Sequence, residues 1–437
     1  MTEQFMFCIG LVIAILLLVM LAQKIKIAYP IVLVVGGLLL SLLPGLPQMN
    51  IDPELIFIIF LPPLLYEAAW YTSYKEFWRW RRVISSFAFI IVLLTSLLVA
   101  VVSNALIPGF TLALGFLLGG IVSPPDAVSA TSILKQVKIP RRVTAILEGE
   151  SLMNDASSLI VFRFALIAVS TGQFVFQKAA ASFFIVIIAG IAVGLAVAFI
   201  YYAVHKWMPT DPNIDVVLTL TAPYAMYLVA EKLHVSGVLA VVSGGLYLSS
   251  RSHIILNHRS RLRGINVWSS LAFVLNGLVF MLIGLELPVI VSQLGDVSLM
   301  AAISYGLIIS ALLIVCRILC TLGASAFTVF ISRFITTADS HPGWRGPLVI
   351  GWAGMRGVVS LAAALSIPIY AAKDVPFPQR NLILFITFTV ILVTLVVQGL
   401  TLPWVIKMVK MEDPDHYASE EDQDVELRKG LEAGSSD

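Results

Sequence analysis

The chain has 437 residues, of which 59% are hydrophobic and 12% are charged. Soluble domains carry about 25% charged residues, so this composition excludes an ordinary soluble protein and indicates a polytopic membrane protein surrounded by the lipid bilayer. The formal net charge is only +2, which argues against nucleic acid as a partner.

The positions of histidine and cysteine argue against an enzyme. The six histidines fall in loops, at predicted helix ends or in the C-terminal segment, away from the middle of the predicted membrane spans. The three cysteines lie inside hydrophobic stretches, where they behave as small apolar residues. We therefore expect no nucleophile–histidine pair and no histidine-based metal site within the membrane. The prediction is a protein that is not an enzyme and holds no cofactor.

Apolar runs bounded by polar residues predict an all-α fold with thirteen transmembrane helices. If the N-terminus lies outside and the C-terminus in the cytoplasm, nearly all loop Lys and Arg residues fall on the cytoplasmic side, as the positive-inside rule requires. The outward loops then hold only Lys178, Lys232, Lys373 and Arg380. The predicted spans are 5–23, 29–47, 54–72, 83–107, 110–134, 143–170, 180–204, 214–231, 235–250, 265–290, 298–330, 346–370 and 381–406.

The third predicted span carries an acid inside an apolar run. Glu67 follows Pro62 and Pro63 and is expected at membrane depth. An ionisable residue there is by default a functional hypothesis, so Glu67 is a candidate for a second ion-binding carboxylate. The alternative is that Glu67 lies close enough to the cytoplasmic end to reach the membrane surface, with Lys75 as its partner.

Two predicted spans are interrupted near their midpoints. The fifth contains Ser-Pro-Pro-Asp at 123–126, where the prolines remove helical donors, and the twelfth contains Gly-Met-Arg-Gly at 354–357, where the glycines weaken the helix. Because these spans are seven apart, they run in opposite directions, as do the broken helices of inverted repeats that meet at a transporter binding site. The alternative is that these residues are ordinary, since Pro and Gly are frequent in transmembrane helices.

The sixth span contains a dense polar run, Glu-Gly-Glu-Ser-Leu-Met-Asn-Asp at 148–155. Asp155 is close to the middle of the span, where desolvation disfavours a charged carboxylate, so it can exchange a proton for a hard cation. Ser151 lies four residues earlier on the same helix face, and its hydroxyl adds an oxygen ligand suited to Na⁺ or Li⁺. The alternative is that Asp155 is permanently paired with a buried arginine.

Two arginines at membrane depth need acidic partners. Arg317 lies in the middle of the eleventh span, and Glu150 is its candidate partner in a buried structural ion pair. Asp126 either pairs with Arg356 and so anchors its broken helix, which we favour, or contacts the transported ion through water. The sequence does not assign a partner to Arg163 in the outer half of the sixth span.

The composition changes abruptly after the last predicted span. Residues 411–437 are acidic and almost free of large apolar side chains, so this segment cannot bury enough apolar surface to fold alone. We predict a disordered cytoplasmic tail at 411–437 and a membrane transporter domain at 1–410.

Three of these motifs resemble those of the monovalent cation/proton antiporter family, which contains bacterial NhaP-type antiporters and animal sodium/proton exchangers. The run Gly-Glu-Ser-Leu-Met-Asn-Asp at 149–155 is similar to the family's helix-six signature. Leu-Pro-Pro-Leu-Leu-Tyr-Glu at 61–67 resembles its helix-three motif, and the sequence at 354–357 resembles its helix-twelve break. The resemblance covers about residues 5–410 and agrees with the predicted span count and orientation.

This resemblance implies a homodimer in the cell (plasma) membrane, in which a core domain slides against a dimerisation domain. By position, the core helices would lie within 83–170 and 298–406. The dimerisation helices would lie within 5–72 and 180–290.

The resemblance also implies a set of site residues. The family's Na⁺ site carries over to Asp155, Ser151 and Glu67, next to the helix-five break. Relatives with Asp-Asp in helix six are commonly electrogenic, so Asn154 implies electroneutral, one-for-one exchange. Where the family often has Thr in helix five, this chain has Pro125, which leaves only a backbone carbonyl at that position. The structural ion pairs that carry over are Glu150 with Arg317 and Asp126 with Arg356.

Together these observations predict a secondary active, electroneutral Na⁺/H⁺ antiporter that serves pH homeostasis. It would exchange one cation for one proton by elevator-like alternating access at a single mid-membrane carboxylate. A K⁺/H⁺ antiporter, or one that accepts Na⁺, Li⁺ and K⁺, is the alternative within this class. A passive cation channel is the alternative from a different class, although two inverted breaks favour a transporter.

Overall fold

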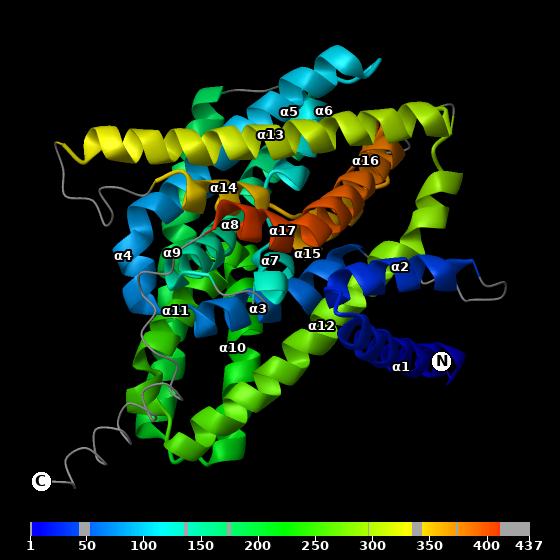
Figure 1. The fold of residues 1–437 in the computed structure, drawn as a ribbon. Helices are drawn as coiled ribbons and strands as arrows, with labels where there is room; N and C mark the ends of the chain where they lie inside the picture. The colour runs from blue at the N-terminus through cyan, green and yellow to red at the C-terminus, as the bar shows by residue number, and fades with distance from the viewer. Residues whose placement is uncertain are drawn as a thin grey trace, which may run out of the picture.

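The computed structural model describes residues 2–42, 53–134, 139–172, 176–295, 297–333, 343–372 and 375–410. The tail predicted at 411–437 and the loop residue Lys373 lie outside these ranges. Within the described residues the chain is mostly helical, as predicted (Figure 1). In chain order the elements are α1 (Thr2–Ile25), α2 (Tyr29–Ser41), α3 (Pro53–Tyr71), α4 (Tyr74–Ser85), the π-helix η1 (Ser86–Ile91), α5 (Val92–Leu106), α6 (Leu112–Val122), α7 (Ala127–Leu134), α8 (Arg141–Thr171), α9 (Phe176–Trp207), α10 (Pro212–Lys232), α11 (Gly237–Ile255), α12 (His258–Ser292), α13 (Leu299–Ile331), α14 (Arg345–Trp352), α15 (Val358–Leu365), β1 (Tyr370–Ala372), β2 (Val375–Pro376), α16 (Arg380–Val393), the π-helix η2 (Thr394–Gln398) and α17 (Gly399–Val409).

Each predicted span coincides with a helix or with consecutive helices. In the described part of the chain, nine helical segments are long and apolar enough to cross a membrane, with α4 to α5, α6 to α7 and α16 to α17 each counted as one segment. The apolar helices at the N-terminal end, α1 and α2, have apolar stretches that are shorter than the length required of these nine segments. The count of thirteen spans and the sides on which the two termini lie stay predictions.

Several predicted boundaries differ from the observed ones by a few residues, and two of the differences change the type of structure assigned. The fourth span was expected to start at residue 83, but α4 begins at Tyr74, because the basic segment before the apolar run is itself an amphipathic helix. Its apolar face, which includes the buried Trp80 and Ile84, packs against α8. The twelfth span was expected to reach residue 370, but α15 ends at Leu365 and a short antiparallel pairing of β1 with β2 follows.

The two interrupted spans lie in the middle of the molecule. Figure 1 shows α7, α14, α15 and α17 grouped between the long helices α12 and α13. Direct contacts join α15 to α3, α6, α8 and α16, and join α7 to α8 and α17. Segments that are far apart in the sequence therefore meet where both helices are broken.

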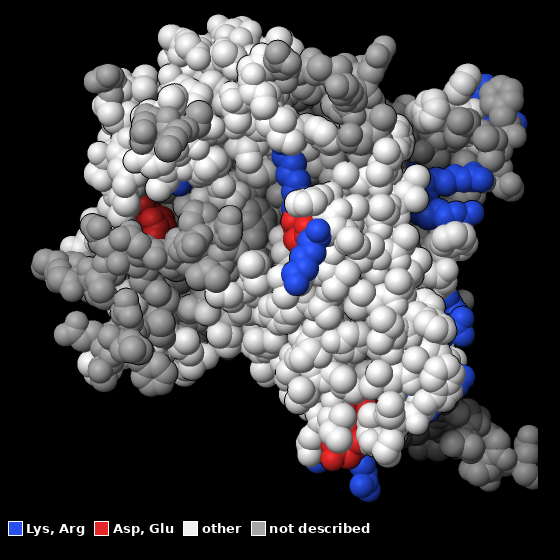
Figure 2. All heavy atoms as spheres, turned by 180° about the vertical axis from the view of Figure 1, so that it is seen from behind, with Lys and Arg blue, Asp and Glu red and all other residues white. Residues whose placement is uncertain are grey.

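The surface of the molecule is suited to a lipid environment. Many large apolar side chains are exposed along the long helices, including Ile188, Leu319 and Trp404. The face seen in Figure 2 is mostly free of charged side chains, and most of its Lys and Arg residues lie near the margins. An apolar surface of this kind is what a bilayer requires of a membrane-spanning protein.

Candidate functional site

The two helix breaks touch each other. The first separates α6 from α7 at residues 123–126, and the second separates α14 from α15 at residues 353–357. Across them, the Asp126 amide donates to the Met355 carbonyl at 2.7 Å. A Cβ at Gly357 would overlap the Asp126 carboxylate, so this position requires glycine. The predicted meeting of the two breaks is thus present in the fold.

Asp126 caps a helix and does not form the ion pair expected with Arg356. Its carboxylate accepts from the Val128 amide at 3.0 Å and from the Ser129 hydroxyl at 2.7 Å. An aspartate that directly precedes a helix has the free amides of the first turn within reach, so these donors take both carboxylate oxygens. The prediction of an Asp126–Arg356 pair is therefore wrong.

Arg356 instead binds the carbonyls left free at two helix ends. Its Nε donates to the Val122 carbonyl of α6 at 2.7 Å, and its Nη1 donates to the Gly354 carbonyl. A guanidinium at helix C-termini interacts favourably with the partial negative charge there. Its own amide donates to the Thr394 hydroxyl at 3.1 Å, which joins the second break to η2. Arg356 therefore stabilises both breaks through backbone carbonyls.

Two residues of α8 hold the first break. Asn154 is fully buried and donates from Nδ2 to the Pro125 carbonyl at 3.0 Å. The Ser151 hydroxyl accepts from the Ala127 amide at 3.1 Å and so satisfies an N-terminal donor of α7. The Pro125 carbonyl, predicted as an ion ligand, is thus engaged by Asn154, although a carbonyl oxygen retains a second lone pair.

Asp155 opens onto a cavity of about 620 Å³. The side chain is 7% exposed, and the described residues offer its carboxylate no ion pair. Ser151, Asp126 and Glu67 line the same cavity, so four of the predicted site residues surround one space. Glu67 reaches it from α3, on the wall opposite α8. The described residues hold no group of three His, Cys, Asp or Glu side chains that would retain a metal ion.

Arg317 and Glu150 are in contact, as the sequence pattern suggests. Arg317 of α13 donates from Nη1 to one Glu150 carboxylate oxygen at 2.7 Å and from Nη2 to the other at 2.9 Å. The two side chains are 3% and 1% exposed. A bidentate arginine–carboxylate contact is the geometry in which two buried charges compensate each other best.

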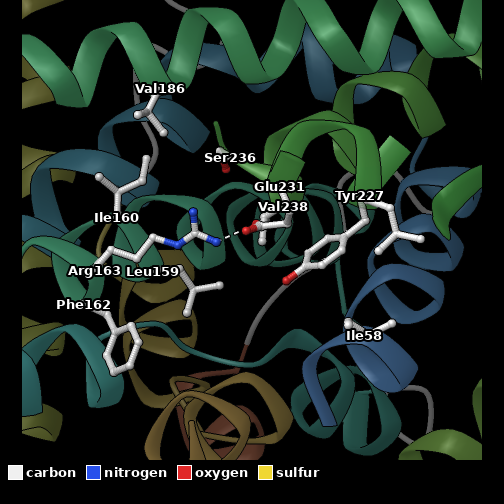
Figure 3. A pocket seen from close by; sticks show the side chains of 12 residues that line it. Ile58, Leu159, Ile160, Phe162, Arg163, Val186, Tyr227, Glu231, Ser236 and Val238 are labelled. Carbon is white, nitrogen blue, oxygen red and sulfur yellow. Dashed lines mark hydrogen bonds and ion pairs between the residues drawn. The ribbon is translucent and has the colours of Figure 1, made fainter. Parts of the chain in front are cut away.

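Sequence reasoning missed the partner of Arg163. Its guanidinium lies 2.5 Å from the Glu231 carboxylate of α10, as Figure 3 shows. The pair lies beside a second cavity of about 360 Å³ with mostly apolar walls, which include Leu159 and Val238. Glu231 sits at the end of an otherwise apolar span, and nothing in the spacing along the chain connects it to α8.

A second polar cluster was also not predicted. Asp215 of α10 accepts from the Ser260 hydroxyl of α12 at 2.6 Å, and its other oxygen lies 3.0 Å from Nδ1 of His205 in α9. All three side chains are buried, so the cluster joins three helices away from the Asp155 cavity. The only sequence signal was a histidine at a helix end.

Comparison with known proteins agrees with this architecture. Residues 11–408 match the family described as "Sodium/hydrogen exchanger, transmembrane". An uncharacterized Na⁺/H⁺ exchanger of Mycobacterium tuberculosis is 33% identical over 417 residues, which are 94% of this chain and 76% of that protein. The sodium, potassium, lithium and rubidium/H⁺ antiporter of Bacillus subtilis is 33% identical over 389 residues, 86% of this chain and 57% of that protein.

A solved structure has the same fold. The sodium proton antiporter MjNhaP1 from Methanocaldococcus jannaschii superposes with a TM-score of 0.72 at 19% identity, covering 94% of this chain and 100% of that chain. The family match extends over nearly the whole membrane region. The chain therefore belongs to the sodium/hydrogen exchanger family of monovalent cation/proton antiporters and is a multi-pass protein of the cell membrane.

Proposed function

We propose that this protein exchanges Na⁺ for H⁺ at the carboxylate of Asp155. The observation that carries the proposal is a nearly buried carboxylate with no ion pair among the described residues, which opens onto a cavity beside two crossed helix breaks. A carboxylate in such surroundings is stabilised by binding either a proton or a cation. Competition between the two ligands for one group gives obligatory exchange.

The charges on α8 support a one-for-one stoichiometry. Of its two buried carboxylates, Glu150 is compensated by Arg317, whereas Asp155 has no such partner in the described part of the chain. Asn154 is neutral and is engaged by the Pro125 carbonyl. One proton or one monovalent cation at Asp155 therefore gives the site the same net charge, and a one-for-one exchange carries no net charge across the membrane.

A broader cation preference is the second candidate. The Bacillus subtilis relative is named for sodium, potassium, lithium and rubidium. In this chain position 125 offers a carbonyl and no hydroxyl, so the ion meets fewer fixed oxygens close to Asp155 than a threonine there would provide. A looser oxygen shell discriminates less sharply between Na⁺ and larger ions. We therefore retain K⁺/H⁺ exchange as the alternative.

We also propose elevator-like alternating access in a homodimer. The cavity lies between two groups of helices, with α7, α8 and α15 on one wall and α2, α3 and α12 on the other. The first group belongs to the proposed core domain within 83–170 and 298–406, and the second to the dimerisation domain within 5–72 and 180–290. A site between two such groups can change the side to which it opens when one group slides against the other.

Substitution of Asp155 tests the central proposal. In proteoliposomes, Asp155→Asn should abolish Na⁺-driven proton flux, because an amide cannot exchange a proton for a cation. Asp211→Asn is the matched control, since Asp211 is an exposed cap at the start of α10. Proton flux that persists in Asp155→Asn at the rate of the control would overturn the assignment.

Three further measurements separate the alternatives. Dequenching of a pH-sensitive dye with Na⁺, Li⁺ and K⁺ in turn ranks the cations and decides between Na⁺/H⁺ and K⁺/H⁺ exchange. On a solid-supported membrane, a Na⁺ concentration jump should transfer no sustained charge, and a sustained current would contradict electroneutrality. Na⁺ flux that is not accompanied by proton movement in the opposite direction would instead indicate a passive channel.

A further inference from the structure

One face of α12 forms part of the wall of the Asp155 cavity. Ile265, Ser269, Ala272 and Asn276 line it, at intervals of three and four residues, and Asn276 lies deepest along the helix from its basic N-terminal end. This spacing places the four side chains on a single helix face. This face of α12 and the polar residues of α8 therefore line the same cavity.

Asn276 has an unusual environment on this face. The residue is 6% exposed, and its amide oxygen has no hydrogen-bond partner among the described residues. Its helix neighbours Leu275 and Val279 are buried and apolar. Buried side-chain amides are nearly always hydrogen-bonded, because an unpaired polar atom removed from water is unfavourable. An unpaired amide at the wall of a cavity indicates a ligand that enters the cavity.

Two oxygen atoms beside the first break are already engaged by protein donors. Ser151 accepts from the Ala127 amide, and the Pro125 carbonyl accepts from Asn154. Asn276 differs from both because no protein donor occupies its oxygen. Monovalent hard cations are bound by carboxylate, hydroxyl and carbonyl oxygens, so an unoccupied amide oxygen is a suitable additional ligand.

We propose that Asn276 is a cation-binding residue of the transport site, supplying its amide oxygen to the ion that Asp155 binds or releases. This inference rests on the proposed exchange at Asp155. A bound proton needs no second oxygen ligand, whereas a dehydrated cation does. Asn276 therefore favours the cation over the proton in their competition, and its loss weakens cation binding without changing proton binding.

The test compares two variants of α12 in proteoliposomes. Asn276→Leu replaces the amide by an apolar group of similar size, and the apparent KM for Na⁺ should rise about tenfold, as expected for a lost contact to a charged group. The maximal rate and the pH dependence at low Na⁺ should change little. Ser270→Ala is the control, because Ser270 is exposed and donates to the Asn266 carbonyl on its own helix.

Asn276→Gln keeps the amide and should retain a KM closer to that of the wild type than Asn276→Leu does. A KM for Na⁺, Li⁺ and K⁺ in Asn276→Leu equal to that of Ser270→Ala would overturn the inference while leaving the exchange at Asp155 intact. Failure of the Asp155→Asn test would instead remove the proposed function.

If Asn276→Leu does not transport, cation-induced thermal stabilisation of the purified protein decides the question. The NaCl concentration that gives half of the stabilising shift should rise about tenfold in Asn276→Leu relative to Ser270→Ala, with LiCl and choline chloride as comparison salts. Equal midpoints in the two variants would overturn the inference.

Discussion

Two ion pairs made by helix α8 differ in their geometry, in their burial and in the helices that they join. Near its middle, Glu150 makes two contacts with Arg317, and the side chains are 1% and 3% exposed. Further along, Arg163 makes a single contact with Glu231, and the side chains are 44% and 31% exposed. The first joins α8 to α13, and the second joins it to α10 across the edge of an apolar cavity.

The comparison teaches that charge inside this protein has two separate uses. In the buried pair, Arg317 compensates the carboxylate of Glu150, five residues from Asp155. The Glu150 carboxylate therefore does not compete with Asp155 for the transported ion. The exposed pair connects helices of the two proposed domains and is weakened by water and salt. A buried pair is strongly destabilised when one partner is lost, whereas an exposed pair contributes little to stability.

The largest expected effect follows removal of one buried charge. Arg317→Leu leaves Glu150 uncompensated and should lower the free energy of unfolding by about 3–5 kcal/mol. Titration of the purified protein with SDS in mild detergent measures this loss. The double variant Glu150→Leu with Arg317→Leu removes both charges and should recover most of the stability. Unfolding of Arg317→Leu at the wild-type SDS concentration would contradict the assigned role of the pair.

An intermediate effect is expected at the helix break. Asp126→Ala removes a cap of α7 and should lower the free energy of unfolding by about 1–2 kcal/mol. Asp211→Ala removes an exposed cap of α10 and should have a smaller effect, since solvent can replace the lost acceptor. The same SDS titration measures both variants. If Asp211→Ala lowered the free energy of unfolding more than Asp126→Ala does, the burial of a cap would not determine how much it stabilises its helix.

The smallest effect is expected at the exposed pair. Arg163→Ala, Glu231→Ala and their double variant form a thermodynamic cycle whose coupling energy should be about 0.2–1 kcal/mol. High salt should reduce the coupling further, because solvent-exposed charges are screened. Thermal unfolding at low and high NaCl measures this difference. A coupling above 2 kcal/mol that does not respond to salt would place this pair in the same class as Glu150 and Arg317.

The two helix breaks and the buried ion pair could be predicted from the sequence, because they follow from the residue types and from their depth in the membrane. Paired prolines at 124–125 and paired glycines around Arg356 weaken their helices and favour the two breaks. Such residues do not suffice by themselves, because the equally paired Pro62 and Pro63 lie inside the continuous helix α3. The pairing of Glu150 with Arg317 follows because a buried charge needs a partner and the choices at that depth are few.

Three features could not be predicted, because they depend on how the helices pack and the spacing of residues along the chain does not determine this packing. The Asp126 carboxylate accepts from groups at the start of its own helix, and the Arg356 guanidinium donates to the Val122 and Gly354 carbonyls, so the predicted pair does not form. The partner of Arg163 lies at the far end of another span, where many residues are equally plausible from sequence. Asn276 is unremarkable in the sequence, and only the fold places its amide beside the cavity.

The contact between the two breaks has a mechanical consequence. The Asp126 amide donates to the carbonyl of Met355, and the Arg356 side chain donates to that of Val122. Each break therefore donates a hydrogen bond to the other. The two segments are in close contact at Gly357, because even one methyl group there would overlap the Asp126 carboxylate and force the segments apart. The crossing is therefore a tightly packed junction, and we predict that Asp155, whose helix holds the first break through Ser151 and Asn154, changes its depth in the membrane only together with both breaks.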